Sequence, residues 1–223
     1  MKQFKIRASA LGQIMTDGKA KGSIGKTCMS YCEQWIKEQL YNRKKEFTNK
    51  YVEKGLIMED NSLDFIAEEL NYGLLFKNQE HFENDYIIGT PDALPNDIVI
   101  DVKNSWDCLT FPLLETEIPN KDYWWQMQAY MLLTGRKVAK LIYVLSDTPK
   151  HLIEKQAYYT AKDTGRDYED VLKELTASMT YADIPNRYKI KVFNVAYDAE
   201  VEAKIINRVN ECRNYINEQT KGI

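Results

Sequence analysis

The segment that most constrains the fold of this chain is Gly89–Lys103, which reads G-T-P-D-A-L-P-N-D-I-V-I-D-V-K. Its last six residues, Ile98–Lys103, are apolar except for Asp101 and Lys103, and this pattern predicts a β-strand. Because side chains alternate between the two faces of a strand, Asp101 and Lys103 point to one face, opposite Ile100 and Val102. An acid and a base together at the end of such a strand indicate a functional site.

Asp92 extends the same pattern, because it follows a tight Thr-Pro step just before this strand. The turn-rich segment 91–97 predicts a hairpin between a strand over 86–90 and the strand over 98–103. Asp92 and Asp101 then meet at one end of the hairpin. The alternative is an exposed hairpin with two incidental acids and a solvated lysine.

The residue types at this hairpin predict a metal-dependent phosphodiester site. Mg²⁺ prefers oxygen ligands, which Asp92, Asp101 and the backbone carbonyl of Val102 supply. A bound Mg²⁺ ion can provide a nucleophilic water, neutralise charge at phosphorus and stabilise the leaving oxygen. Lys103 is expected to orient or activate the attacking water, or to hold the scissile phosphate.

Composition is compatible with this site without requiring it. A chain of 223 residues with 44% apolar content suits one large domain, and we treat 1–223 as a single domain. A formal net charge of -3 gives no global positive field, so any contact with nucleic acid depends on local basic segments. No apolar run approaches the roughly 18 residues of a membrane span, and the start lacks a signal-peptide segment. We therefore expect a cytoplasmic protein with no membrane partner.

Helical and strand patterns alternate along the chain. Helical periodicity predicts helices over 8–15, 27–41, 50–70, 122–134, 166–180 and 198–219. Apolar runs predict strands over 74–76, 86–90, 98–103, 138–145 and 188–195, with 157–159 as a further short strand or extended segment. This order predicts one α/β domain with a mixed central β-sheet flanked by helices on both faces.

Several motifs of this chain resemble those of a known family. The P-D of Asp92, followed by the D-V-K that ends at Lys103, is the signature of the PD-(D/E)xK nuclease superfamily. Three flanking segments are similar, in order and spacing, to the phage lambda-type exonucleases and their YqaJ-like viral recombinase relatives. They are Ile6–Ile14 near the start, Glu53–Glu59 with a G-x-x-x-E element, and Tyr123–Met131 with a Q-x-Q helix. The resemblance implies a restriction-endonuclease-like core.

The resemblance adds two residues to the site. It implies that Glu59 is a metal ligand, directly or through water, whereas its surroundings alone would make it one of many surface acids. It also implies that Gln126 positions the nucleophilic water together with Lys103. Gln126 and Tyr130 lie four residues apart and so share one helical face, while Gln128 points elsewhere.

The N-terminal segment carries the predicted DNA-end contacts. Ser9 can be an ordinary helix N-cap, but a capped helix start near Lys2 and Arg7 can also bind an anion. The resemblance implies that this region holds the 5′-terminal phosphate of DNA. Ser9 matches the family's serine, and Lys2 or Arg7 must substitute for the family's arginine.

The function that the resemblance implies is a Mg²⁺-dependent deoxyribonuclease, most closely a 5′→3′ exonuclease on linear double-stranded DNA. It would produce 3′ single-stranded tails for phage-type recombination in a bacterial host cell. The expected cofactor is a pair of Mg²⁺ ions in each active site, with Mn²⁺ as the alternative ion. The resemblance further implies a ring-shaped homotrimer and a single-strand-annealing protein as partner.

Two other classes remain open. One is a RecB-like or CRISPR-adaptation nuclease, or an endonuclease, with the same core, and the other is a non-catalytic module that binds DNA ends. The CRISPR-adaptation kind needs four cysteines around an iron–sulfur cluster. The spacing of Cys28, Cys32, Cys108 and Cys212 instead favours reduced thiols at buried or partly buried positions.

Overall fold

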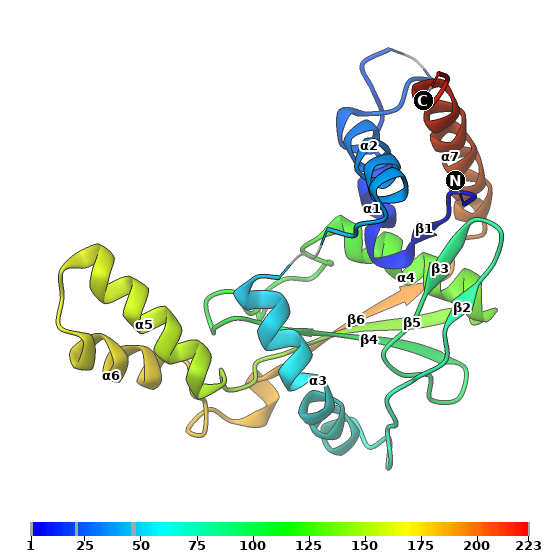
Figure 1. Ribbon diagram of the computed structural model, residues 1–223. Coiled ribbons are helices and arrows are strands. Elements are labelled where there is room, and N and C mark those ends of the chain that lie inside the picture. Colours follow the sequence, from blue (N-terminus) through cyan, green and yellow to red (C-terminus); the bar gives the residue numbers. More distant parts are fainter. Residues whose placement is uncertain (1, 21, 46–47, 223) are drawn as a thin grey trace.

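The protein has an α/β fold, as the alternation of patterns predicts. The structure is a computed structural model that describes residues 2–20, 22–45 and 48–222 of the chain. Within these ranges, seven α-helices surround two three-stranded sheets, so the predicted central sheet is divided in two (Figure 1). None of the helices in these ranges has the length and apolar character that crossing a bilayer requires.

The larger sheet carries the strand with the charged pair. It contains β4 (Ile98–Asn104), β5 (Val138–Val144) and β6 (Ile190–Ala196), in the order β4-β5-β6. β4 runs parallel to β5, and β6 runs antiparallel to β5. The register pairs Asp101 with Leu141. Because β4 is paired with a full strand on one edge only, its other edge is free to receive the segment that contains Asp92.

The second sheet is small and lies close to the N-terminus. It contains β1 (Ile6–Arg7), β2 (Phe82–Glu83) and β3 (Ile87–Gly89), in the order β1-β3-β2. β3 is parallel to β1 and antiparallel to β2. The predicted hairpin between β3 and β4 is therefore wrong, since β3 takes both its partners from elsewhere.

Two long helices cover the faces of the larger sheet. α3 (Lys50–Glu69) packs on the face that holds the even-numbered β4 residues, and α4 (Lys121–Thr134) packs on the other. The apolar residues on the α3 side are Leu63, Ile66, Ile100, Val102, Ile142 and Val144. Those on the α4 side include Val99, Met127, Met131, Ala139 and Leu141. The alternation predicted for β4 is confirmed, because Ile100 and Val102 face away from Asp101.

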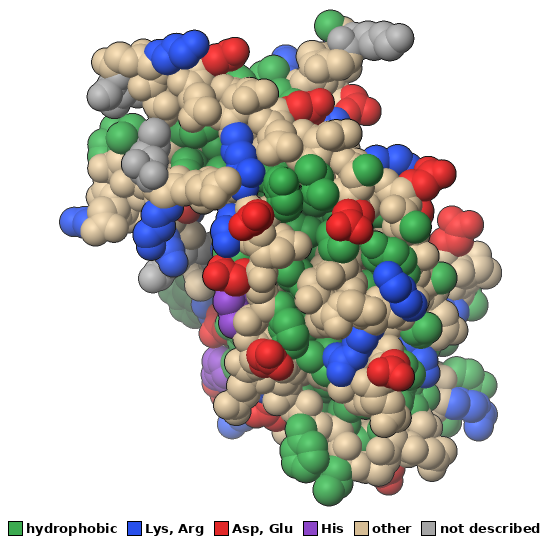
Figure 2. All heavy atoms as spheres, turned by 90° about the vertical axis from the view of Figure 1, so that its right-hand side faces the viewer, with side chains coloured by type: hydrophobic (Ala, Val, Ile, Leu, Met, Phe, Trp, Pro, Cys, Tyr) green, Lys and Arg blue, Asp and Glu red, His purple; other side chains and the backbone are tan. Residues whose placement is uncertain are grey.

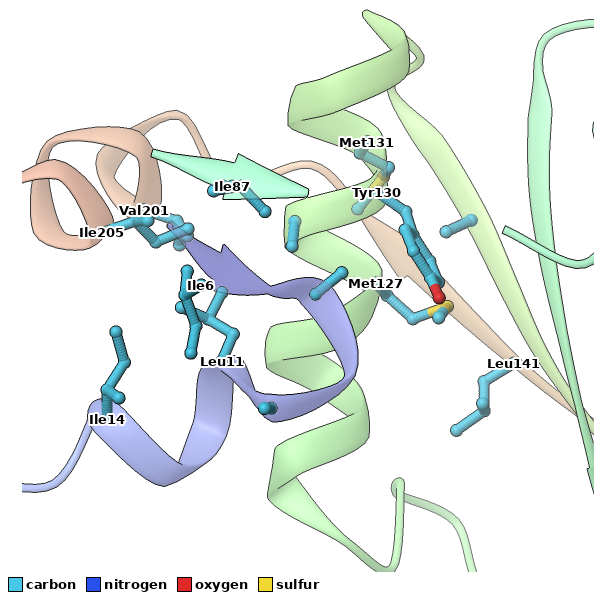
Figure 3. Packing of buried hydrophobic residues seen from close by; sticks show 14 of the residues in the cluster. Ile6, Leu11, Ile14, Ile87, Met127, Tyr130, Met131, Leu141, Val201 and Ile205 are labelled. Carbon is cyan, nitrogen blue, oxygen red and sulfur yellow. The ribbon is translucent and has the colours of Figure 1, made fainter. Parts of the chain in front are cut away.

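α4 is the central helix of the fold. Figure 3 shows Met127 and Tyr130 between Leu141 of the larger sheet and the N-terminal segment that carries Ile6. The small sheet can approach α4 closely because β3 ends in glycine. A Cβ atom at Gly89 would lie 2.8 Å from Cε1 of Tyr130, so a side chain there would collide with the helix.

The remaining helices form two groups. α2 (Lys26–Tyr41) and α7 (Ala199–Gln219) lie side by side near the two chain termini (Figure 1). α5 (Lys150–Thr164) and α6 (Tyr168–Ser178) pack against each other and project from the opposite end of the molecule (Figure 1). α1 (Leu11–Ile14) is a single short turn that precedes α2.

Polar caps fix where the long helices begin. Oδ1 of Asn49 accepts hydrogen bonds from two backbone N–H groups at the start of α3, and Asn120 accepts one at the start of α4. Asp167 and Asp198 do the same for α6 and α7. α4 ends at Gly135, whose positive φ of 73° is the left-handed stop that the sequence predicts.

Three predicted elements take another form. Residues 74–76 make no strand, and the adjoining Lys77 has only a single bridge to Ala93. Residues 157–159 are helical and lie within α5. The predicted helix over 8–15 is a 3₁₀ turn, Ala8–Ala10, followed by α1. These errors share a cause, since short apolar runs do not distinguish strand from helix or loop.

Candidate active site

One cleft gathers every residue predicted for metal binding and water positioning. It has a volume of about 480 Å³ and lies at the carboxyl end of β4. The residues predicted from the sequence that line it are Glu59, Asp92, Asp101, Val102, Lys103 and Gln126. Crevices beyond the carboxyl ends of strands are the usual ligand sites of α/β folds, so the position itself favours a site.

Asp101 and Lys103 form the closest charged contact in this cleft. Nζ of Lys103 lies 2.6 Å from Oδ2 of Asp101, and the Asp101 side chain is only 2% exposed. The Lys103 ammonium group also lies 4.6 Å from the ring centroid of Tyr123, where the ring face attracts the cation. Its carboxylate and aromatic contacts hold Lys103 at the wall of the cleft.

Gln126 joins the acid and the base. Its Nε2 donates to Oδ1 of Asp101 at 3.1 Å, and its Oε1 accepts from Nζ of Lys103 at 3.4 Å. Nε2 also donates to the hydroxyl of Tyr130 at 3.0 Å, one turn along α4. Gln128, in contrast, points away from the cleft and donates to the carbonyl of Ala196. The helical-face prediction therefore separates the two glutamines correctly.

Asp92 reaches the free edge of β4. Its Oδ2 accepts a hydrogen bond from the backbone N–H of Val102 at 2.6 Å. Nearby on the same edge, Ala93 exchanges backbone hydrogen bonds with Ile100. Because the N–H and C=O of one strand residue point to the same edge, the carbonyl of Val102 lies on the Asp92 side. Asp92 and this carbonyl are thus neighbours, although β3 and β4 form no hairpin.

Glu59 lies on α3, lines the cleft and forms an ion pair with Lys77. Its Oε2 lies 2.9 Å from Nζ of Lys77. The carboxylate oxygens of Glu59, Asp92 and Asp101 do not all lie within 4.8 Å of one another. Among the described residues, nothing packs against Gly55, because a Cβ there would meet nothing within 4 Å. Gly55 instead leaves the cleft open beside Glu59.

The cleft disfavours the ionised forms of Asp92 and Asp101. Burial, and then the negative charge of Asp101, raises the pKa of Asp92 to about 8. Burial also raises the pKa of Asp101, although the charge of Lys103 opposes it. Burial acts to lower the pKa of Lys103, but the adjacent Asp101 outweighs it and raises that pKa above its usual range. A buried acid and a partly buried acid with raised pKa values indicate a site where positive charge is needed.

These residues fit a divalent cation. Two carboxylates and one backbone carbonyl are the oxygen donors that Mg²⁺ or Mn²⁺ takes, with water completing the coordination. Oδ2 of Asp101 is buried and makes no hydrogen bond beyond its ion pair with Lys103. A cation between Asp92 and Asp101 would offset the negative charge of Asp101, which together with burial raises the pKa of Asp92. The metal site stays a prediction.

The N-terminal residues lie outside this cleft. Lys2, Arg7 and Ser9 are all exposed, and none of them lines the cleft. Ser9 caps no helix, because it lies inside the 3₁₀ turn whose first N–H groups receive no side-chain bond. The helix cap that the sequence predicts at Ser9 is therefore not formed. The predicted role of these three residues in binding a 5′-phosphate stays a prediction.

Sequence reasoning missed a buried polar network that fixes α3 to the larger sheet. Lys54 is fully buried, and its Nζ donates to the carbonyls of Trp106 and Ser146 and to the hydroxyl of Thr148. Burial lowers the pKa of Lys54 to about 8. Lys54 follows another charged residue, Glu53, and no local pattern indicates its burial, so the sequence offered no means of finding it.

The sheet end carries a second part of this network. Asn104, the last residue of β4, accepts hydrogen bonds from Ser62 of α3 and from Ser146 after β5. Together with Lys54, these bonds tie α3 to the carboxyl ends of β4 and β5. They therefore set where Glu59 lies relative to Asp101.

Charge is mixed on one face of the molecule. Figure 2 shows the face on the right-hand side of Figure 1, where Lys and Arg side chains are interspersed with Asp and Glu. DNA contacts on this face would thus depend on local cations rather than on a continuous positive surface.

The fold of this chain has counterparts among solved structures. No protein-family model and no curated protein sequence matches this chain. Among solved structures, a phage-related exonuclease from Haemophilus somnus 129PT superimposes with a TM-score of 0.81 and 25% identity. The match covers 99% of this chain and 96% of that chain. This chain shares the fold of the phage-related exonucleases.

A second exonuclease supports the same assignment at greater distance. LHK-Exo, an alkaline exonuclease from Laribacter hongkongensis, superimposes with a TM-score of 0.65 and 17% identity, over 96% of this chain and 89% of that one. The same enzyme in complex with dAMP gives a TM-score of 0.64. The resemblance to the lambda-type exonucleases is confirmed, and so is the predicted α/β fold class.

Proposed function

We propose that this chain is a Mg²⁺-dependent DNA exonuclease that degrades linear double-stranded DNA from 5′ ends. The observation that carries the proposal is the contact of Asp101, Lys103 and Gln126 at the carboxyl end of β4. Its support is the shared fold, because the neighbours that match over nearly the whole chain are exonucleases. The dAMP complex of one neighbour is in keeping with a DNA substrate.

Metal binding is assigned to the acidic side of the cleft. Asp92, Asp101 and the carbonyl of Val102 would hold the first Mg²⁺ or Mn²⁺ ion, and Glu59 would contribute to a second, directly or through water. When bound, such ions supply an activated water and stabilise charge on the phosphate. The ion pair of Glu59 with Lys77 must loosen before Glu59 can take this part.

Lys103 and Gln126 act on the water and the phosphate. Nζ of Lys103 is held at the cleft wall by Asp101 and Tyr123, and it can donate to a water or to a phosphate oxygen. Gln126 keeps Asp101 and Lys103 in place and adds no charge near the developing negative charge on phosphorus. A preorganised arrangement of this kind lowers the barrier because little rearrangement is needed during the reaction.

The remaining parts of the proposal concern the DNA end and its handling. Lys2, Arg7 and Ser9 would bind the 5′-terminal phosphate. The protein would form a ring-shaped homotrimer around the DNA and act with a single-strand-annealing protein as partner. It would act in the cytoplasm of a bacterial host. These parts of the proposal follow from the family resemblance.

A polarity assay tests the proposal. Linear duplex DNA with a label at either the 5′ or the 3′ end is incubated with the protein and Mg²⁺, and covalently closed circular duplex serves as control. Early release of the 5′ label, abolished by EDTA and faster with a 5′-phosphate than with a 5′-hydroxyl, is the expected result. Early release of the 3′ label, or cutting of the closed circle, would assign the chain to another nuclease class. DNA binding without any cleavage in Mg²⁺ or Mn²⁺ would make it a DNA-end-binding module.

A further inference from the structure

Three of the four cysteines meet in one buried place. Cys28 and Cys32 lie one turn apart on α2, and Cys212 lies on α7. Their Sγ atoms all lie within 4.8 Å of one another, and Sγ of Cys28 is 3.4 Å from Sγ of Cys212. All three side chains are fully buried, whereas Cys108 is exposed and separate. The four-cysteine arrangement of an iron–sulfur protein is therefore not formed.

The sulfur spacing fits the coordination sphere of a single ion. Metal–thiolate bonds of about 2.3 Å place three sulfur ligands about 4 Å apart around one ion. The Cys28–Cys212 separation is 3.4 Å and no separation exceeds 4.8 Å, so small side-chain adjustments bring all three Sγ atoms to that distance. A disulfide would use only two of the three thiols and would leave the third without a role.

The surroundings favour at least one thiolate in this group. Hydrogen bonds from Cys212 and Cys32, with the positive charge of Arg208, lower the pKa of Cys28 to about 4 against the effect of burial. Arg208 lies one turn before Cys212 on α7 and also contacts Asp17 and Glu211. Thiolates are soft ligands, which select Cu(I) and Zn(II) over the hard cations that carboxylates bind.

We propose that Cys28, Cys32 and Cys212 form a buried three-thiolate site for one thiophilic cation of the Cu(I) and Zn(II) class. On binding, all three cysteines coordinate the ion as thiolates, and the thiol protons that the ion displaces pass to solvent. Among the described residues, no fourth Cys, His, Asp or Glu joins the group. Cu(I), which is stable with three thiolates, therefore binds more tightly than Zn(II), whose structural sites are four-coordinate.

The site joins two segments that are 184 residues apart in the chain. α2 and α7 lie side by side near the two termini, so a bound ion would fasten the C-terminal helix to the N-terminal half of the protein (Figure 1). None of the three cysteines lines the nuclease cleft. The inference therefore stands or falls independently of the proposed nuclease activity, and its readouts do not depend on DNA cleavage.

Metal titration of the full chain tests the proposal. The starting protein is Cys108→Ser, which removes the exposed thiol that would bind metal adventitiously. Cu(I), and separately Zn(II), is titrated without oxygen against a chromophoric chelator. One equivalent of Cu(I) is expected to bind, with a rise in Tm of about 5 °C or more at a hundredfold excess over Kd. Adding Cys28→Ala, Cys32→Ala or Cys212→Ala should weaken Cu(I) binding by about 100-fold or more.

Two further measurements keep the result interpretable if an alanine variant folds poorly. The X-ray absorption spectrum of the loaded Cys108→Ser protein counts the ligands of the ion, and three sulfur neighbours are expected. The proposal is overturned by fewer than three sulfur neighbours, or by binding that survives in a folded Cys28→Ala protein. It is also overturned if neither ion competes with the chelator, or if mass spectrometry finds the isolated protein short of two thiol hydrogens, which indicates a disulfide.

Discussion

Nζ of Lys103 lies 2.6 Å from Oδ2 of Asp101, and the amide of Gln126 contacts both side chains. Each of these three side chains thus contacts the other two. Asp101 and Lys103 lie on β4, and Gln126 lies on α4, which packs on the sheet. Asp92 approaches from the free edge of the same strand. The candidate site is therefore a set of mutual contacts rather than a motif alone, and each contact can be tested.

Gln126→Met is expected to lower kcat by about 10- to 100-fold, because it removes the amide that holds both Asp101 and Lys103. Steady-state cleavage of linear duplex DNA measures the effect. Tyr130→Phe removes only the hydroxyl that accepts from Gln126, so its loss should stay below about tenfold. Gln128→Met is the matched control, since it should reduce stability while the folded fraction keeps its kcat. Equal rates for Gln126→Met and wild type would show that the amide has no part in the reaction.

Lys77 is expected to compete with metal for Glu59, because its Nζ lies 2.9 Å from the Glu59 carboxylate. Lys77→Met should therefore lower the Mg²⁺ concentration for half-maximal activity by up to about fivefold, the range of a partly exposed ion pair. Glu59→Gln should raise that concentration. Activity titrated with Mg²⁺ in each variant distinguishes the two effects. If both variants match wild type, Glu59 does not take part in metal binding.

The metal-free protein is expected to lose stability as pH rises towards 8, because the pKa of Asp92 is about 8 in the folded chain and about 3.9 when unfolded. Between these values the native state keeps a proton that the unfolded state loses, so the free energy of unfolding falls with pH. Asp92→Asn removes this titration. Near pH 8 the variant should exceed wild type by about 2 kcal/mol or more, since each pKa unit corresponds to about 1.4 kcal/mol.

Urea unfolding in EDTA at several pH values measures this difference. Asp97→Asn, at an exposed position on the same loop, is the control and should follow wild type throughout. A gap between Asp92→Asn and wild type that stays constant from pH 4 to pH 8 would contradict the assigned pKa. Added Mg²⁺ should raise the stability of the wild-type protein near pH 8 and leave that of Asp92→Asn nearly unchanged.

Lys54→Met is expected to reduce the free energy of unfolding by about 2–3 kcal/mol, because it leaves buried acceptors on Trp106, Ser146 and Thr148 without their donor. Lys37→Met makes the same change at an exposed position of α2 and should cost less than about 0.5 kcal/mol. Chemical unfolding of the two variants gives the comparison. Similar small losses in both would show that the Lys54 contacts contribute little.

The strand pattern and the helical faces were sufficient to predict much of the site. Period-two alternation correctly placed Asp101 and Lys103 on one face of β4, and four-residue spacing placed Gln126 beside Tyr130. These are short-range consequences of backbone geometry, so they can be read from a single sequence. Long periodic helices such as α3 were predicted to within a few residues for the same reason.

The contacts between distant segments could not be predicted. Nothing local indicates that β3 pairs with β1, that Lys77 reaches Glu59, or that Cys212 meets Cys28. Each depends on how the layers pack, and packing is determined by the whole chain. The N-cap predicted at Ser9 is wrong for a related reason, because Ser9 fits the residue preference of an N-cap but the chain forms a 3₁₀ turn there.

The most direct test of the account is the rate of DNA degradation by Lys103→Met and Asp101→Asn. Linear duplex DNA in Mg²⁺ is the substrate, circular dichroism confirms folding, and Lys173→Met on the exposed face of α6 is the control. The account predicts that both site variants degrade DNA at least about 100-fold more slowly than wild type, while the control does not differ. Folded variants with rates within about threefold of wild type would contradict the assignment of this cleft as the active site.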